Sequence, residues 1–159
     1  MVSLLFAGDR LESRPLIESS LAEFEFVICD RYVPSNIAHQ AAKAPAGERD
    51  ELQAWIEFVE YDLYRLPRAD RVIWLDVPVS CAQELILRKQ KRSYTEQAAD
   101  LQEADGVYLE QVQQVYARLA ANNSNWRRID GCPNGRLRDP ADVAAEILSA
   151  VLDQPTTDH

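Results

Sequence analysis

Asp30 and Arg31 stand where an apolar run, residues 24–29, gives way to polar side chains. We predict that this run is a buried strand, and ligands of open α/β sheets bind beyond the carboxyl ends of strands, so both charged side chains would emerge in a binding site. A guanidinium fork suits a phosphate because it donates two parallel hydrogen bonds. Hydroxyl and amide groups that suit a base edge follow at Ser35, Asn36 and Gln40. The alternatives are a surface ion pair for the charged residues and turn capping for the polar ones.

Two further groups of residues could serve the same chemistry. Phe6 and Arg10 are four residues apart, so on a helix they share one face and offer a flat apolar ring beside a cation. Core packing is the alternative for Phe6. A basic cluster follows later in the chain at Arg88, Lys89, Lys91 and Arg92. Its alternative is a solvated face.

The elements that must position these residues alternate along the chain. Helices are predicted over residues 4–11, 15–21, 48–64, 79–89, 101–121 and 140–152, and strands over residues 24–29, 72–77 and 126–130. Apolar stripes that should face the core are Leu52, Ile56, Val59 and Leu63 in one helix and Val107, Tyr108, Val112, Val115 and Leu119 in another. Strands separated by helices predict an α/β fold with a parallel, doubly wound sheet and flanking helices.

The composition is that of one ordinary soluble domain. The chain has 159 residues, 47% of them hydrophobic, and no apolar run approaches the roughly 18 residues that span a bilayer. The first residues lack the basic flank and length of a secretory signal, so we expect a cytoplasmic protein. A net charge of −9 opposes binding to a nucleic-acid polymer, which needs a basic face.

The three cysteines, Cys29, Cys81 and Cys132, are far apart in the sequence and lack the paired spacing of a metal site. We predict that they are reduced, structural thiols, with Cys29 inside the predicted core strand.

Several segments together resemble the thymidylate kinase family. Asp30-Arg31-Tyr32, followed by Ser35, Ala38 and Gln40, is similar to that family's Asp-Arg-Tyr/His loop, and residues 4–10 resemble its preceding helix. Residues 72–78 and the basic cluster are similar to its next strand and mobile lid. Asp100, Glu103 and a helix over residues 108–116 follow in the expected places. The resemblance runs from about residue 3 to about residue 150.

One departure from the family pattern is large. Kinases of this fold cradle the donor phosphates in a glycine-rich P-loop that ends in Gly-Lys-Ser/Thr, and none of the five glycines here is followed by lysine. The resemblance therefore implies an amino-terminally truncated kinase without the first strand, P-loop and first helix, roughly 50 or more residues by the size of such units. About three strands would remain, with a gap where the P-loop strand lies between residues 24–29 and 72–77.

The resemblance implies an activity and roles for the residues. The family transfers the γ-phosphate of ATP to thymidine monophosphate (dTMP), giving dTDP in dTTP synthesis, with Mg²⁺ as cofactor. By resemblance, Arg31 takes the dTMP phosphate, Asp30 lies near Mg²⁺ through water, Phe6 faces the pyrimidine and Arg10 reaches the base edge or phosphate. Arg88 and Arg92 would stabilise the transferred phosphate, Asp100 and Glu103 would orient lid or substrate groups, and residues 130–135 fall where the adenine-binding loop lies. His39 stands where the family usually has an aromatic residue, which implies a role in shape alone.

The implied organisation is a partial nucleoside monophosphate kinase domain over residues 1–152, with a lid at about residues 88–100 and a disordered tail at residues 153–159. The family also implies a homodimer. Two alternatives remain: a nucleotide-binding regulatory subunit that keeps Phe6, Arg10 and Arg31, and a structural partner that dimerises through the helices at residues 4–11 and 48–64.

Overall fold

The structure, a computed structural model, describes residues 2–82, 84 and 99–152, and the side chains of residues 99–105 are not part of this description. Arg88 and Arg92 of the predicted lid lie outside the described residues, and so does the predicted tail at residues 153–159. The chain forms two compact units, residues 1–69 and residues 70–159. No described helix has both the length and the apolar character needed to cross a membrane.

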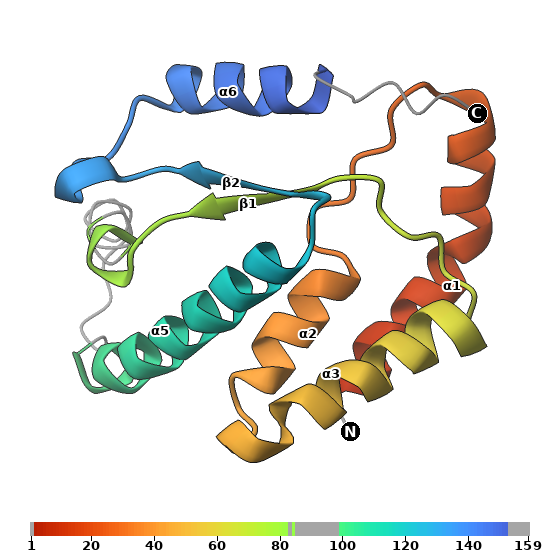
Figure 1. The fold of residues 1–159 in the computed structure, drawn as a ribbon, viewed down its shortest axis with the longest axis horizontal. Coiled ribbons are helices and arrows are strands. Elements are labelled where there is room, and N and C mark those ends of the chain that lie inside the picture. The colour runs from red at the N-terminus through yellow and green to blue at the C-terminus, as the bar shows by residue number, and fades with distance from the viewer. Residues whose placement is uncertain (1, 83, 85–98, 153–159) are drawn as a thin grey trace. The chain divides into compact units, whose positions relative to one another are not determined.

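The first unit is helical. It contains α1 (Val2–Glu23), α2 (Val33–Ala41), a short 3₁₀ turn η1 (Ala46–Glu48), α3 (Arg49–Glu57) and a π-helical segment η2 (Phe58–Leu63). Helix α2 packs against both α1 and α3, and α1 also contacts η2 (Figure 1). Pro34 stands in the first turn of α2, where its missing N–H is not needed. The buried apolar residues of this unit include Ala7, Val33, Ile37, Ala38, Ile56 and Val59.

Helix α1 differs from its prediction at Pro15. The sequence predicts two helices, residues 4–11 and 15–21, whereas the structure has one helix of 22 residues that continues through this proline. Proline removes one hydrogen bond and crowds the preceding turn, but the turns on both sides keep their own hydrogen bonds. Phe6 and Arg10 consequently lie on a longer helix than expected, still one turn apart.

The strand predicted at residues 24–29 is not formed, and this prediction was wrong. Ile28 is 86% exposed, Phe24 is 57% exposed, and the free thiol of Cys29 is exposed instead of buried. An apolar run becomes a strand only when a neighbouring strand pairs with its backbone, and the described residues contain no strand that pairs with this segment. Asp30 and Arg31 therefore follow an unpaired segment, and two strands are observed in the described chain in place of about three.

The helix predicted at residues 48–64 changes its hydrogen-bond period at Phe58. From there the backbone follows the wider π-helical turn, which rotates the following side chains around the axis. Ile56 and Val59 are buried as predicted, but Leu63 is 61% exposed, so its predicted core position was wrong. The side chain that turns inward is Glu60, with no exposed surface.

The second unit holds a parallel pair of strands, β1 (Val72–Asp76) and β2 (Trp126–Asp130), aligned from Val72 opposite Trp126 to Asp76 opposite Asp130. Helix α5 (Ala99–Asn122) lies on one side of this pair and helix α6 (Pro140–Leu152) on the other (Figure 1). A strand at residues 126–130 and a helix at residues 140–152 confirm the predictions at those positions. The parallel pairing agrees with an incomplete α/β fold.

Most of the predicted α5 stripe faces the core. Val112, Val115 and Leu119 are at most 5% exposed, whereas Val107, at 59%, lies outside the core. Residues 79–82 are helical directly after Pro78, which confirms the start of the helix predicted there.

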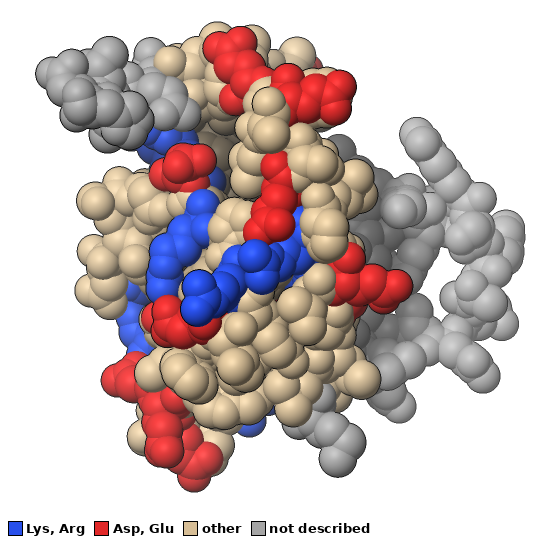
Figure 2. All heavy atoms as spheres, turned by 90° about the vertical axis from the view of Figure 1, so that its right-hand side faces the viewer, with Lys and Arg blue, Asp and Glu red and all other residues tan. Residues whose placement is uncertain are grey.

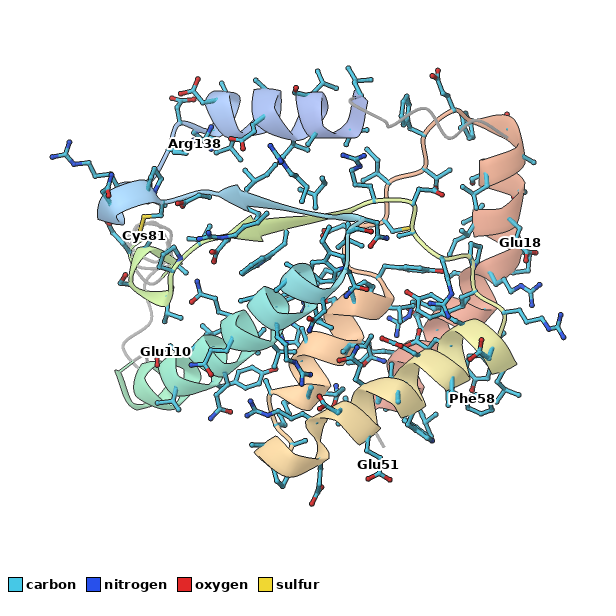
Figure 3. All side chains as sticks on the ribbon, in the orientation of Figure 1. Glu18, Glu51, Phe58, Cys81, Glu110 and Arg138 are labelled. Atoms are coloured by element: carbon cyan, nitrogen blue, oxygen red, sulfur yellow. A yellow bond between two sulfur atoms is a disulfide. The ribbon has the colours of Figure 1, made fainter. Side chains whose placement is uncertain are left out.

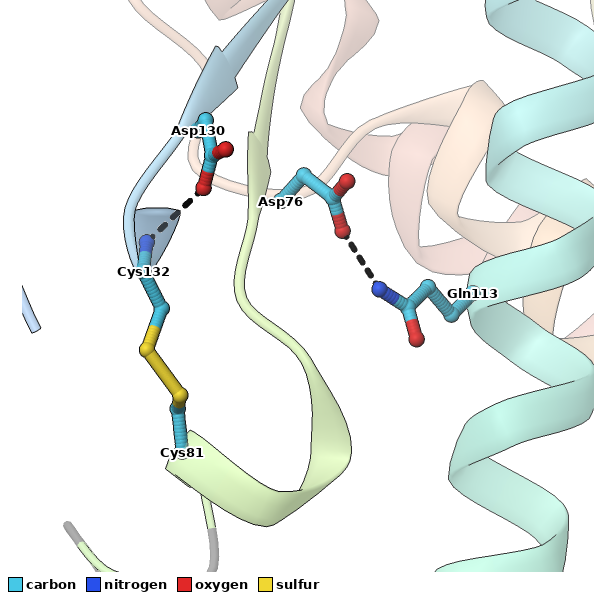
Figure 4. The surroundings of a disulfide bond; sticks show 5 residues. All are labelled: Asp76, Cys81, Gln113, Asp130 and Cys132. Atoms are coloured by element: carbon cyan, nitrogen blue, oxygen red, sulfur yellow. Dashed lines mark hydrogen bonds between the residues drawn. A yellow bond between two sulfur atoms is a disulfide. The ribbon is translucent and has the colours of Figure 1, made fainter. Parts of the chain in front are cut away.

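A disulfide joins Cys81 and Cys132, so the prediction of reduced thiols was wrong for this pair (Figure 4). Cys81 lies in the helical turn after β1 and Cys132 in the loop after β2. Adjacent parallel strands end at the same edge of a sheet, which brings the two segments together although 51 residues separate them. The backbone N–H of Cys132 also donates to Asp130 Oδ1 at 2.9 Å.

We expect reduction of this disulfide to destabilise the protein. Cross-linking residues this far apart restricts the unfolded chain, which corresponds to about 2–4 kcal/mol of unfolding free energy. Urea unfolding followed with and without dithiothreitol measures the difference, and Cys132→Ser should reproduce the reduced value and no longer respond to reductant. Cys29→Ser is the matched control, since Cys29 is free. Equal midpoints for the oxidised and reduced protein would contradict a stabilising role.

Candidate functional site

A buried carboxylate organises the first unit. Glu60, which has no exposed surface, accepts two hydrogen bonds from Arg10 of α1: Nε donates to Oε2 at 2.5 Å and Nη2 donates to Oε1 at 2.6 Å. The Arg10 side chain is 13% exposed. A bidentate pair of this kind fixes the guanidinium plane as well as neutralising the buried charge. Neither of these two hydrogen bonds uses Arg10 Nη1.

Asn36 is the third member of this cluster. Its Nδ2 donates to Glu60 Oε1 at 2.8 Å and lies 3.1 Å from Ser3 Oγ and 3.3 Å from the Ser3 carbonyl oxygen. Its Oδ1 is buried and, within the described part of the chain, has no hydrogen-bond partner. An unpartnered buried acceptor costs about 1–3 kcal/mol, so this oxygen is a place where a donor from a ligand would be stabilising.

Arg31 is held in an unusual backbone conformation beside α2. Its φ of 65° lies in the left-handed region, which is uncommon for a residue with a side chain. Arg31 Nε donates to Ser35 Oγ at 3.1 Å, and Nη2 lies 2.6 Å from His39 Nε2. Ser35 and His39 are one helical turn apart, so one face of α2 holds the guanidinium while the residue itself stays exposed.

Two tyrosines near this cluster stay neutral at physiological pH. Burial raises the pKa of Tyr32 to about 12, a nearby Cys29 charge adds to the rise, and Arg10 opposes it. The Tyr32 hydroxyl donates to the Pro67 carbonyl oxygen at 2.9 Å. Burial likewise raises the pKa of Tyr61, whose ring lies 4.1 Å from the Arg68 guanidinium carbon. Both hydroxyls are therefore donors and not general bases.

The structure brings part of the predicted site together. Arg10 and Asn36 meet on Glu60, and Arg31 meets Ser35. Phe6, 52% exposed, precedes Arg10 by one turn of α1, as the spacing predicted. Asp30 is exposed and Gln40 is partly buried. Asp100 and Glu103 lie in α5 with side chains that are not described.

Glu60 was missed by the sequence prediction, although a signal existed. Glu60 directly follows Val59, which belongs to an apolar helical stripe, so its carboxylate must either stay exposed or be buried beside a cation. Arg10 is that cation. The resemblance implied only a shape role for His39. In the structure its ring nitrogen Nε2 contacts the Arg31 guanidinium.

A second polar cluster lies within the second unit, around Asp76 at the end of β1. This carboxylate is 4% exposed, accepts from Arg128 Nε and Gln113 Nε2, each at 2.6 Å, and the Arg128 guanidinium carbon lies 5.8 Å from the Trp74 ring centroid. A cavity of about 820 Å³ adjoins the cluster and is lined also by Pro78, Ser80 and Glu110. The sequence signal was again a carboxylate that ends an apolar strand. Its charge is already paired, which makes Asp76 structural in this arrangement.

Within the part of the chain that the structure describes, the features of an ATP–Mg²⁺ site are not present. The sequence contains no Gly-Lys-Ser/Thr, and the described residues contain no group of three potential metal ligands around Asp30 or elsewhere.

Charges of both signs are interspersed on the surface. The face drawn in Figure 2 carries a short run of basic side chains bordered by acidic ones.

Comparison with known proteins shows one family. The sequence model described as thymidylate kinase matches residues 1–134. The thymidylate kinase of Mycobacterium tuberculosis is 32% identical over 120 residues, which cover 76% of this chain and 56% of that protein. A probable thymidylate kinase of Pyrobaculum aerophilum is 31% identical over 150 residues, 94% of this chain and 66% of that protein. A putative thymidylate kinase of Aeropyrum pernix is 26% identical over 155 residues, 96% of this chain and 68% of that protein. The chain thus spans little more than half the length of the mycobacterial relative.

Proposed function

The chain belongs to the thymidylate kinase family, and we propose that its first unit binds dTMP, the acceptor in transfer of the ATP γ-phosphate to give dTDP. In this proposal Arg31 takes the phosphate of dTMP. Phe6 offers a flat apolar face to the pyrimidine, and Arg10 and Asn36 meet the edge of the base. Ser35 positions Arg31, and Gln40 adds an amide near the base.

The observation that carries the proposal is the shared attachment of Arg10 and Asn36 to the Glu60 carboxylate. Arg10 supplies donors and Asn36 supplies an acceptor, Oδ1, on two side chains that are joined through one carboxylate. Thymine presents a carbonyl acceptor beside an N–H donor on its edge, which is the complementary pair. Cytosine presents the opposite order, so the same groups would leave two polar atoms unmatched. Asn36 Oδ1 has no exposed surface, so its contact forms only when neighbouring side chains move aside.

Arg31 offers the second support. Its guanidinium is oriented by Ser35 through Nε and by His39 through Nη2, and neither contact uses Nη1, which we propose for a phosphate oxygen. An orientation set before binding reduces the side-chain entropy lost when the phosphate arrives.

Binding of dTMP to the 159-residue chain tests the proposal directly. Titration calorimetry should show one site, with weaker binding of dCMP than of dTMP. Arg31→Lys should weaken dTMP binding by roughly 1.5–3 kcal/mol, about 10- to 150-fold, because an oriented guanidinium is replaced by a flexible ammonium that acts as a point charge.

The matched control for that substitution is Arg14→Lys. Arg14 pairs with Glu18 and donates to the Tyr64 carbonyl oxygen within the same unit, and it is not among the residues proposed to contact dTMP. Equal losses for the two variants, or an unchanged affinity in Arg31→Lys, would mean that Arg31 is a structural residue and that the phosphate site lies elsewhere.

The donor side of the reaction is proposed from the sequence resemblance alone. Arg88 and Arg92 would stabilise charge on the transferred phosphate, Asp100 and Glu103 would orient the lid, and Asp30 would reach Mg²⁺ through water. The P-loop that completes such a site is proposed to belong to a segment missing from these 159 residues. This assignment is supported by the absence of Gly-Lys-Ser/Thr from the sequence.

We also propose that the family's homodimer applies to this chain, through α1 and the α3–η2 helix. Large apolar side chains are exposed there, among them Leu5 at 72%, Trp55 at 42% and Phe58, labelled in Figure 3, at 55%. Exposed apolar surface of this extent in one unit is typical of an interaction surface.

A further inference from the structure

We propose that His39 is a positioning residue, whose neutral imidazole holds the Arg31 guanidinium in the orientation that receives the acceptor phosphate. The inference rests on the proposed function for the identity of the ligand. It goes beyond it by assigning a role to a residue that the family resemblance places as a shape element only.

The geometry around Arg31 carries the inference. Arg31 lies in the loop before α2 and has a left-handed backbone conformation. Its side chain therefore leaves the backbone in a different direction than it would from a helix or a strand. Two side chains of α2, one turn apart, contact its guanidinium. Ser35 Oγ accepts from Nε at 3.1 Å, and His39 Nε2 lies 2.6 Å from Nη2. Without His39, only one of these two points would hold the plane.

The chemistry of the pair defines the protonation state of His39. Arginine carries donors and no acceptor, so the Arg31–His39 contact requires an unprotonated Nε2 and places the ring proton on Nδ1. A protonated imidazole has N–H groups at both positions, so it cannot accept from Arg31 and repels it. The contact therefore exists only while the ring is neutral.

The surroundings of His39 favour that neutral state. Burial lowers the pKa of His39, and the positive charges of Arg31, from the preceding loop, and Lys43, which follows α2, lower it further. His39 consequently stays neutral at a pH where an exposed histidine would begin to protonate.

Two substitutions separate positioning from shape. His39→Gln keeps an acceptor oxygen for Arg31 at every pH, whereas His39→Phe keeps a ring without an acceptor. We expect His39→Phe to weaken dTMP binding about tenfold at pH 7.5 and His39→Gln to stay within about threefold of the parent. If His39→Phe binds as the parent does and His39→Gln does not, the residue acts by shape and the inference is overturned.

The pH dependence supplies a second readout. The dTMP phosphate itself titrates near pH 6, so the His39→Gln variant provides the baseline. Relative to this variant, the parent should lose affinity as the pH falls through the pKa of His39. A relative gain instead would show that protonated His39 acts as a second cation for the phosphate, which overturns the positioning role.

A ligand-free measurement distinguishes this inference from the proposed function. Imidazole ¹⁵N spectra should show His39 as the Nδ1–H tautomer, and Arg31→Ala should raise the His39 pKa, with the other histidine, His159, as internal reference. An Nε2–H tautomer, or a pKa that does not respond to Arg31→Ala, overturns the inference even if dTMP binds. Failure of the parent chain to bind dTMP removes the proposed function, and the phosphate role of His39 falls with it.

Discussion

Arg10→Ala is expected to lower the unfolding free energy of the first unit by about 3–5 kcal/mol. The substitution removes both hydrogen bonds that Arg10 donates and leaves the Glu60 carboxylate buried, with Asn36 as its remaining donor. An uncompensated buried charge costs far more than the loss of an exposed ion pair, since water cannot replace the missing partner. Urea unfolding monitored by tryptophan fluorescence, with Trp55 in α3 as the reporter of this unit, measures the change.

Glu18→Ala is the matched control for that experiment. Glu18 pairs with Arg14 on the same helix at 2.7 Å, but its side chain is 47% exposed (Figure 3). Exposed pairs of this kind contribute about 0–1 kcal/mol, so little change is expected.

A double variant, Arg10→Met with Glu60→Met, separates stability from binding. Replacing both members of a buried pair by apolar residues removes the uncompensated charge, so much of the stability should return. Binding of dTMP should stay weak, because Arg10 is a proposed contact to the base. Similar stabilities for Arg10→Ala and Glu18→Ala would show that the Arg10–Glu60 pair does not hold the unit together.

The 159-residue chain is expected to show no phosphoryl transfer to dTMP, whereas a version extended at its amino terminus by a strand, P-loop and helix should use ATP and Mg²⁺. Phosphoryl transfer depends on holding donor and acceptor in line and on neutralising the transferred group, which needs the backbone cradle of a P-loop. The present sequence supplies no such cradle. A coupled assay of ADP release at saturating dTMP gives the comparison.

The extended version carries its own control in the P-loop lysine. Its replacement by methionine should abolish turnover but leave dTMP binding unchanged, because the proposed acceptor contacts all lie in the first unit. Clear dTMP-dependent turnover by the 159-residue chain would show that a P-loop is not required. If the extended version binds dTMP and ATP without turnover, the regulatory nucleotide-binding alternative gains support.

The sequence by itself determined the elements that depend on local pattern. The period of apolar residues was sufficient for β2 at Trp126–Asp130 and α6 at Pro140–Leu152. Alternating strands and helices indicated the parallel pairing, and the Asp30-Arg31-Tyr32 motif indicated the family that residues 1–134 match. The signal for each of these elements lies in a short stretch of the sequence, and their order along the chain is visible directly, so they can be recognised without knowledge of the fold.

The tertiary structure decided everything that depends on a distant partner. The apolar run at residues 24–29 has no paired strand in the described chain, Cys81 meets Cys132 across 51 residues, and Arg10 meets Glu60 across 50. The π-helical turn at Phe58 shifted the buried face from Leu63 to Glu60. The left-handed backbone of Arg31 directs its side chain toward His39. Hydrogen bonds, ion pairs and disulfides require two groups at one place, and a linear pattern gives the identity of each group but not the distance between them.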